Sequence, residues 1–265
     1  MFGCLCGDIR QPGIKRSQLG TVIEKHLRRI SLLSPNLRLL QYSIMPDHVH
    51  LLLFVTARTE LHLGKYISKL KILIYQEYRD ITGNTDSIFE EDYYDCILHS
   101  NRSLDTLYRY IRENPRRLAV RRAHPEFFRR VNRLKIGENY YQAYGNFPLR
   151  ECPFKEQVIV HRADTPEKRT ANHDMWLYTA ANGGVLVSPF ISPAEKAIRA
   201  EAEEAGGRFI LIINQSLAER YKPVGRDFGL CEAGRLLIVS AGLGADLTRA
   251  ACQTMNTIAE TICKQ

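Results

Sequence analysis

The chain has 265 residues, of which 45% are hydrophobic and 25% are charged. This composition predicts a globular protein with one large domain or two of ordinary size. The sequence has no run of about 20 apolar residues and no basic head followed by an apolar run, so we expect a cytoplasmic protein without a membrane span. Its seven cysteines include no C-x-x-C pair, which argues against a disulfide framework and a structural zinc site.

The charge is distributed unevenly along the chain. Residues 1–135 contain 23 Lys and Arg against 14 Asp and Glu, a net charge of +9, whereas the remaining residues carry a net charge of −1. A basic first half beside a neutral second half indicates two domains, the first of which meets a polyanion. The alternative is that the basic surface only keeps the protein soluble.

Hydrophobic periodicity divides the first half into six expected elements. The expected helices span residues 17–32, 61–80 and 104–112, and the expected strands span residues 37–45, 48–55 and 87–98. Pro46-Asp47 predicts a tight turn between two strands, and Asn114-Pro115 predicts the end of the last helix. The order of elements predicts an α+β domain with its helices on one face of the sheet.

The second half alternates short β-rich runs with helical patterns. The runs lie at 157–161, 184–188, 208–213 and 235–240, and the helical patterns lie at 165–181, 193–205 and 247–263. This alternation predicts a doubly wound parallel sheet of the α/β class. We therefore expect a first domain over 1–135, a linker over 136–152 and a second domain over 153–265.

Four polar side chains in the first half suit metal-assisted chemistry. His48 and His50 stand two apart on a strand, so both imidazoles point to one side, where they can bind a divalent metal. Tyr110 and Asn114 stand four apart on a helix and share a face, so the Asn114 amide oxygen is a candidate third ligand beside Tyr110. The alternatives are ordinary packing for the histidines, a core position for Tyr110 and a C-terminal cap for Asn114.

A dense group of cations follows this helix and is opposed by a single carboxylate. Its members are Arg116, Arg117, Arg121, Arg122, Arg129, Arg130, Arg133 and Lys135. Such density indicates binding of DNA phosphates, and a solvated helix face is the alternative.

The segment YSIMPDHVHLLL, followed about 60 residues later by YIRENPRRL, resembles the single-tyrosine HUH transposases and, within them, the REP-associated tyrosine transposases. The resemblance implies a ferredoxin-like fold over about residues 2–135. It implies that Tyr110 is the nucleophile and that His48, His50 and Asn114 hold Mg²⁺ or Mn²⁺. The implied substrate is single-stranded or hairpin DNA, which becomes joined to the protein as a 5′-phosphotyrosine.

The resemblance also predicts a gap in the sheet. Members of this family begin with a strand upstream of the position of Phe2-Gly3, and this sequence has no such strand there. That strand would lie beside the strand with His48 and His50. We therefore expect a ferredoxin-like sheet whose first strand is missing, with a metal site loosened by exposed backbone groups.

In the second half, the segment GGVLVSPFISPAEKAI reads as strand, turn and helix. Ser188, Ser192 and Lys196 are candidate phosphate contacts, because a helix N-terminus that follows a parallel strand attracts anions. The alternative is a capping box formed by Ser192 and Glu195. With the EAGRLLIVS run and the N-x-I-A-E helix, this half resembles the Rossmann-like domain of the DNA-processing protein A type, within the SLOG group, which implies a nucleotide- or DNA-binding fold.

Two functions follow from these patterns. The first is a metal-dependent DNA strand transferase, a tyrosine HUH transposase. The second is a non-catalytic DNA-binding remnant whose Rossmann-like domain binds nucleotide or DNA and regulates. The sequence leaves open whether the protein acts as a homodimer.

Overall fold

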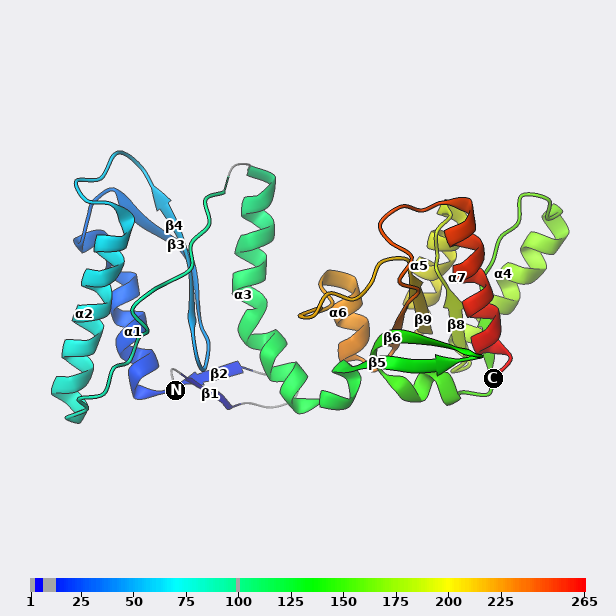
Figure 1. Ribbon diagram of the computed structural model, residues 1–265, viewed down its shortest axis with the longest axis horizontal. Helices are drawn as coiled ribbons and strands as arrows, with labels where there is room; N and C mark the ends of the chain where they lie inside the picture. The colour runs from blue at the N-terminus through cyan, green and yellow to red at the C-terminus, as the bar shows by residue number, and fades with distance from the viewer. Residues whose placement is uncertain (1–2, 7–12, 99–100) are drawn as a thin grey trace. The chain divides into compact units, whose positions relative to one another are not determined.

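The computed structural model describes residues 3–6, 13–98 and 101–265, and it divides the chain into two units, Met1–Ala123 and His124–Gln265 (Figure 1). In the first unit the strands are β1 (Gly3–Cys6), β2 (Gly13–Arg16), β3 (Leu37–Ile44) and β4 (Val49–Val55). Its helices are α1 (Gln18–Arg28), the 3₁₀ helix η1 (Ile30–Leu32), α2 (Leu63–Thr82) and α3 (Asn101–Ala123). The first unit is therefore α+β, as its sequence predicts.

The core of the first unit lies between the β3–β4 hairpin and the packed helices α1 and α2. The buried side chains that form it are Leu19, Val22, Ile23, Leu27, Ile30, Ile44, Leu70 and Ile74. Val49, Leu51 and Leu53 of β4 pack against this core. Because side chains alternate along a strand, His50 and Leu52 face the other side of the hairpin.

The third helix, α3, contacts β3 and β4 from that other side (Figure 1). The expectation that the helices lie on one face is therefore wrong. The order of elements gives the helices but not the face each covers, and here α3 buries Ile111, Ala119 and Val120. The hairpin is consequently enclosed by helices on both faces.

Helix α3 also runs past the point where the sequence predicts its end. It continues through Pro115 to Ala123, although a proline inside a helix removes one backbone hydrogen bond. Ala119 and Val120 are buried after the proline, so packing offsets the lost bond. The expected stop at Asn114-Pro115 is wrong because tertiary contacts override the local preference.

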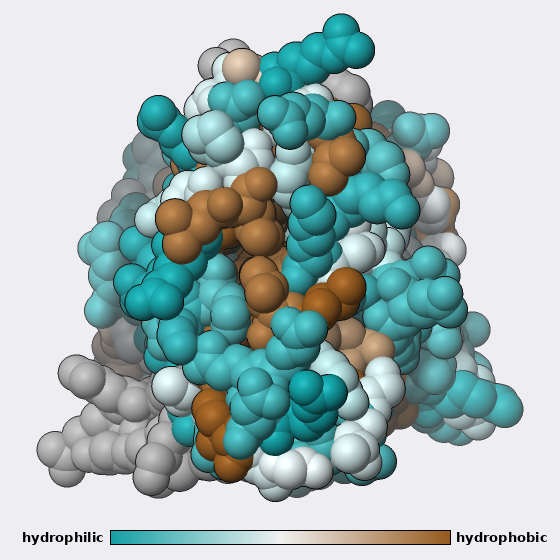
Figure 2. Space-filling view, turned by 90° about the vertical axis from the view of Figure 1, so that its left-hand side faces the viewer, coloured by the Kyte–Doolittle hydropathy of each residue, from teal (hydrophilic) through white to brown (hydrophobic). Residues whose placement is uncertain are grey.

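The strand expected over 87–98 is an irregular segment that lies beside α2. The Lys71 ammonium donates to the backbone carbonyls of Glu90, Glu91 and Asp92 at 2.7–3.1 Å, so these acceptors bond to a side chain and not to a strand. A groove of about 430 Å³ separates this segment from α2. Figure 2 shows a band of apolar side chains on this face of the unit, and α2 contributes the exposed side chains Ile72, Leu73 and Ile81.

A ferredoxin-like sheet is not observed in the described residues of the first unit. There, β3 and β4 pair only with each other, and β1 and β2 form a separate antiparallel pair. In this part of the structure the hairpin is packed between α1 and α2 on one face and α3 on the other.

The second unit is built on a mixed six-stranded sheet with the order β5-β6-β10-β9-β8-β7. Its strands are β5 (Arg129–Ile136), β6 (Asn139–Gly145), β7 (Lys155–Gln157), β8 (Val185–Ser188), β9 (Arg208–Ile213) and β10 (Leu236–Ser240). Its helices are α4 (Pro166–Ala181), α5 (Pro193–Glu204), α6 (Gly225–Glu232) and α7 (Arg249–Cys263), with 3₁₀ helices η2 (Pro125–Phe128) and η3 (Phe147–Glu151). Strands β7 to β10 are parallel, so the expected parallel sheet forms the larger part of the observed one.

Both faces of the parallel part are buried. Val187, Ile210 and Val239 point to the side covered by α7. The alternate residues point to the opposite side, where α4 and α5 pack together (Figure 1). Burial on both faces explains why these strands appear in the sequence as continuous apolar runs.

The boundary between the domains differs from the expected one. The structure divides the chain after Ala123, whereas the sequence predicts a boundary at 135 and a linker over 136–152. In place of a linker, β6 pairs antiparallel with β10 and with β5, and η3 follows. The pairing of Tyr144 with Ile238 joins segments far apart in the chain, so no local pattern reveals it.

Helix α5 begins with the expected capping box. The Ser192 hydroxyl accepts from the Glu195 backbone N–H at 3.2 Å, and the buried Glu195 carboxylate accepts from the backbone N–H groups of Ser192, Ile191 and Val160 at 2.8–3.3 Å. One side chain thus joins the helix start to the segment after β7.

Among the described residues no helix is both long and apolar enough to cross a bilayer.

We expect Glu195→Ala to destabilise the second unit by about 1–3 kcal/mol, because it leaves buried N–H groups without their acceptor. Chemical denaturation followed by circular dichroism measures this loss. Glu204→Ala, at an exposed position of the same helix, is the control and should change the free energy of unfolding by less than about 0.5 kcal/mol. Equal effects of the two substitutions would contradict the assigned role of Glu195.

Candidate catalytic site

The two histidines lie where the β3–β4 turn enters β4, and their side chains converge. The Nε2 atoms of His48 and His50 are 3.0 Å apart, and the rings meet edge to face with their centroids 4.7 Å apart. The Nδ1 atom of His48 lies 2.7 Å from a carboxylate oxygen of Asp47. The strand alternation predicted from the H-x-H spacing therefore brings two ring nitrogens to one point.

The residues present fit a divalent cation. Two neighbouring ligands of an octahedral ion with bonds of about 2.1 Å stand about 3.0 Å apart, which is the separation of the two Nε2 atoms. The carboxylate on the far nitrogen of His48 is the usual support for a metal-binding imidazole. No three His, Cys, Asp or Glu side chains cluster as a metal site in residues 3–6, 13–98 and 101–265.

Tyr110 lies beside this pair. Helix α3 places its ring centroid 6.1 Å from that of His50, and the side chain is 40% exposed. This exposure does not fit the alternative in which Tyr110 is a core aromatic. The ring instead lies partly open to solvent beside His50.

Asn114 follows one turn later on the same helix and is 7% exposed. Since α3 continues to Ala123, Asn114 does not form a C-terminal cap. It stands inside the helix on the side that carries the buried Ile111. The structure thus places Tyr110 against the histidine pair and Asn114 one turn beyond it.

The electrostatics of the site favour a neutral His50. Burial, followed by repulsion from His48, lowers the pKa of His50 below its usual 6.5. The hydrogen bond to His48, aided by the more distant charge of Arg122, lowers the pKa of Asp47. The surroundings therefore disfavour the cationic form of His50 and favour the ionised form of Asp47.

The predicted group of eight cations is divided between the two units. Arg116, Arg117, Arg121 and Arg122 belong to α3 of the first unit, whereas Arg129, Arg130, Arg133 and Lys135 belong to β5 of the second. The chain therefore passes from one unit to the other within this group.

Several of these cations make contacts within their own unit. Arg117 is 7% exposed and pairs with Glu113 at 3.1 Å. The Arg130 guanidinium donates to the backbone carbonyls of Leu217, Ala218 and Glu219. The members of the group with exposed side chains are Arg116, Arg122, Arg129, Arg133 and Lys135.

The structure supports the capping alternative for the phosphate candidates of the second unit. The Ser188 side chain is fully buried, and its hydroxyl accepts from the Phe190 backbone N–H at 3.0 Å. At the start of α5, the Glu195 carboxylate already accepts the N–H groups that an anion would use. Ser192 caps the helix, and Lys196 is exposed.

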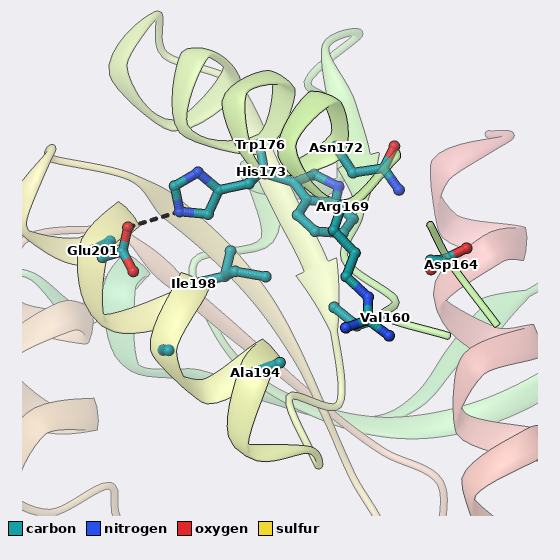
Figure 3. A pocket seen from close by; sticks show the side chains of 10 residues that line it. Val160, Asp164, Arg169, Asn172, His173, Trp176, Ala194, Ile198 and Glu201 are labelled. Carbon is teal, nitrogen blue, oxygen red and sulfur yellow. Dashed lines mark hydrogen bonds and ion pairs between the residues drawn. The ribbon is translucent and has the colours of Figure 1, made fainter. Parts of the chain in front are cut away.

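A separate cavity of about 230 Å³ lies between α4 and α5, with Trp176 and Ile198 among its lining (Figure 3). Its charged residues bond to other groups of the unit: His173 to Glu201 at 2.8 Å, Asp164 to Lys168 at 2.7 Å, and Arg169 to the backbone carbonyl of Arg162 at 3.1 Å. Ser188, Ser192 and Lys196 do not line it.

Comparison with known protein families supports the resemblance to transposases that the sequence of the first unit indicates. The family described as "Transposase IS200 like" matches residues 6–114, a range that contains His48, His50, Tyr110 and Asn114. The predicted resemblance to this class of transposases is thereby confirmed for the first unit.

Among solved structures, the chain is similar to DNA processing protein A from Streptococcus pneumoniae. The identity is 20%, the TM-score is 0.37, and the similarity covers 76% of this chain and 75% of that chain. The sequence of residues 153–265 resembles the same type of protein. No curated protein matches the chain.

Asp47 is the residue at the site that the motifs alone did not single out. The sequence assigns Pro46-Asp47 to a turn, and a turn is a sufficient reason for an aspartate at this position. The one feature of the sequence that could have indicated a second role is that Asp47 directly precedes the first histidine of D-H-V-H. Only the contact with Nδ1 distinguishes a partner of His48 from an ordinary turn residue.

We expect His50 to titrate below pH 6.5 in the folded chain, because burial and the charge of His48 disfavour its cation. A lowered pKa means that the unfolded state binds the proton more readily. The stability that neutral His50 contributes is thus present above about pH 6.5 and is lost as the pH falls below it. An NMR titration of the imidazole, assigned with His50→Gln, measures the midpoint, and a midpoint at or above 6.5 would contradict the expectation.

Proposed function

We propose that this protein is a metal-dependent DNA strand transferase of the single-tyrosine HUH type. The observation that carries the proposal is the convergence of the His48 and His50 Nε2 atoms at 3.0 Å with the exposed Tyr110 ring beside them. The match of residues 6–114 to IS200-like transposases supports the same reaction class. His48, His50 and Asn114 would hold Mg²⁺ or Mn²⁺, and Tyr110 would be the nucleophile.

In this proposal the chemistry is a transesterification. The Tyr110 hydroxyl loses its proton and its oxygen bonds to the scissile phosphorus, while the bond from phosphorus to the 3′ oxygen breaks. The leaving oxygen takes up a proton and becomes a free 3′-OH, and the strand remains joined as a 5′-phosphotyrosine. Attack by another 3′-OH reverses these steps and restores the tyrosine, so no nucleotide cofactor is required.

The protein groups have separate tasks in this reaction. A divalent cation, when bound, supplies the Lewis-acid charge that polarises the phosphate. The hairpin and α3 hold the imidazoles and the phenol near one another before substrate arrives, which lowers the entropic cost of attack. Of the exposed cations, Arg122 is the one whose charge acts on Asp47, so we assign it to the DNA backbone next to the site.

We expect Tyr110→Phe to abolish a covalent adduct with single-stranded hairpin DNA, because phenylalanine has no oxygen to form the ester. The measurement is incubation with labelled DNA and Mn²⁺ followed by a denaturing gel. Tyr108→Phe is the matched control, since Tyr108 lies on the same helix and is equally exposed. Loss of the adduct in both variants, or in neither, would contradict the role of Tyr110.

We expect His48→Ala and His50→Ala each to reduce adduct formation by more than about 100-fold. Changes to residues that only support a metal ligand already cost about 10–100-fold, so loss of a ligand should cost more. EDTA should abolish the adduct and added Mn²⁺ should restore it. The exposed His62, replaced as His62→Ala, is the control for loss of an imidazole, and an adduct that survives EDTA would exclude a metal-dependent reaction.

One observation favours a second candidate function, a DNA-binding remnant without catalysis. In the described residues the histidine strand belongs to a two-stranded hairpin, so the site lacks the support of a wider sheet. A native gel that retains hairpin DNA without any covalent adduct would support this function. Sedimentation of the same complex would test whether a homodimer binds the DNA.

A further inference from the structure

The turn residue Asp47 has a side chain that the turn does not need. The β3–β4 turn is closed by the backbone N–H of Met45, which donates to the carbonyl of His48 at 2.8 Å. The Asp47 carboxylate points instead to Nδ1 of His48 at 2.7 Å, although the side chain is 83% exposed. The turn therefore does not explain why this exposed carboxylate is held against a ring nitrogen of His48.

The contact determines which nitrogen of His48 carries the proton. An ionised carboxylate only accepts hydrogen bonds, so Nδ1 must donate. In a neutral imidazole the other nitrogen, Nε2, then holds a lone pair. That lone pair faces Nε2 of His50 at 3.0 Å, where the His50 N–H donates to it until a cation replaces this hydrogen bond.

We propose that Asp47 is a positioning residue that fixes His48 in the tautomer whose Nε2 lone pair points into the histidine pair. The inference rests on the proposed function in that the pair is taken to bind a divalent cation. Asp47 would touch neither the cation nor the DNA and would act only through His48. The pairing of Ser43 with His50 places the His50 side chain on this side of the hairpin, whereas the ring of His48, which stands before β4, is in contact with the Asp47 carboxylate.

The test uses the full chain without metal and compares Asp47→Ala with Asp47→Asn. Nitrogen NMR of the histidine rings, recorded at about pH 8 where a free imidazole is neutral, reports the tautomer directly. In the wild type we expect His48 to carry its proton on Nδ1. Asp47→Ala should give a mixture with the Nε2–H form, whereas Asp47→Asn should keep the wild-type tautomer, because the amide oxygen still accepts.

Calorimetric titration with Mn²⁺ alone gives a second readout. We expect Asp47→Ala to weaken Mn²⁺ binding by about 10–100-fold, the usual cost of losing a carboxylate behind a metal-binding histidine. Asp47→Asn should bind within about threefold of the wild type. Asp86→Ala removes an exposed carboxylate of the same unit, so it controls for the change in net charge and should bind like the wild type.

The results separate this inference from the proposed reaction. A wild-type His48 with its proton on Nε2, or an Asp47→Ala chain that binds Mn²⁺ like the wild type, would overturn the role of Asp47. If the wild type binds no Mn²⁺, both the inference and the proposed function fall. Tautomer and Mn²⁺ results as expected, with no phosphotyrosine adduct, would support Asp47 and overturn only the reaction.

Discussion

The position of α3 against the β3–β4 hairpin is the constraint on which the candidate site depends. Val49 and Leu51 of β4 pack against the core of α1 and α2, so strand geometry forces His50 to the opposite side. Helix α3 covers that side and brings the Tyr110 ring to 6.1 Å from His50. One hydrophobic pattern therefore buries the core and, on its reverse face, brings a tyrosine ring beside two neighbouring imidazoles.

The parts of the site that depend on short spacing could be predicted from the sequence. Alternation in a strand joins His48 to His50, and the helical period relates Tyr110 to Asn114, without any long-range information. The continuation of α3 through Pro115 could not be predicted in this way, because the rule for residues before proline describes local strain alone. Burial of Ala119 and Val120 decides that the helix continues, and burial is a property of the whole unit.

The boundary between the units was beyond sequence reasoning for a similar reason. A run rich in arginine looks like part of one domain when it is read in order, but its second half lies in β5, which pairs with β6, and β6 pairs with the distant strand β10. The contacts of Arg130 depend on that pairing, since its guanidinium donates to the carbonyls of Leu217, Ala218 and Glu219 within the second unit. A cation count therefore indicates an anionic partner but not which cations face it.

Two carboxylates leave different groups open to a phosphate. Glu195 places its negative charge on the N–H groups at the start of α5, so a phosphate there would have to displace a buried carboxylate that the helix already stabilises. Asp47 instead contacts Nδ1 of His48 and leaves the space in front of Nε2 open. In the proposed function its charge would strengthen the imidazole as a ligand, and a cation between the two imidazoles would make that side positive. Under that proposal a phosphate would be favoured at the histidine pair and disfavoured at the start of α5, although a helix N-terminus is the more familiar anion site.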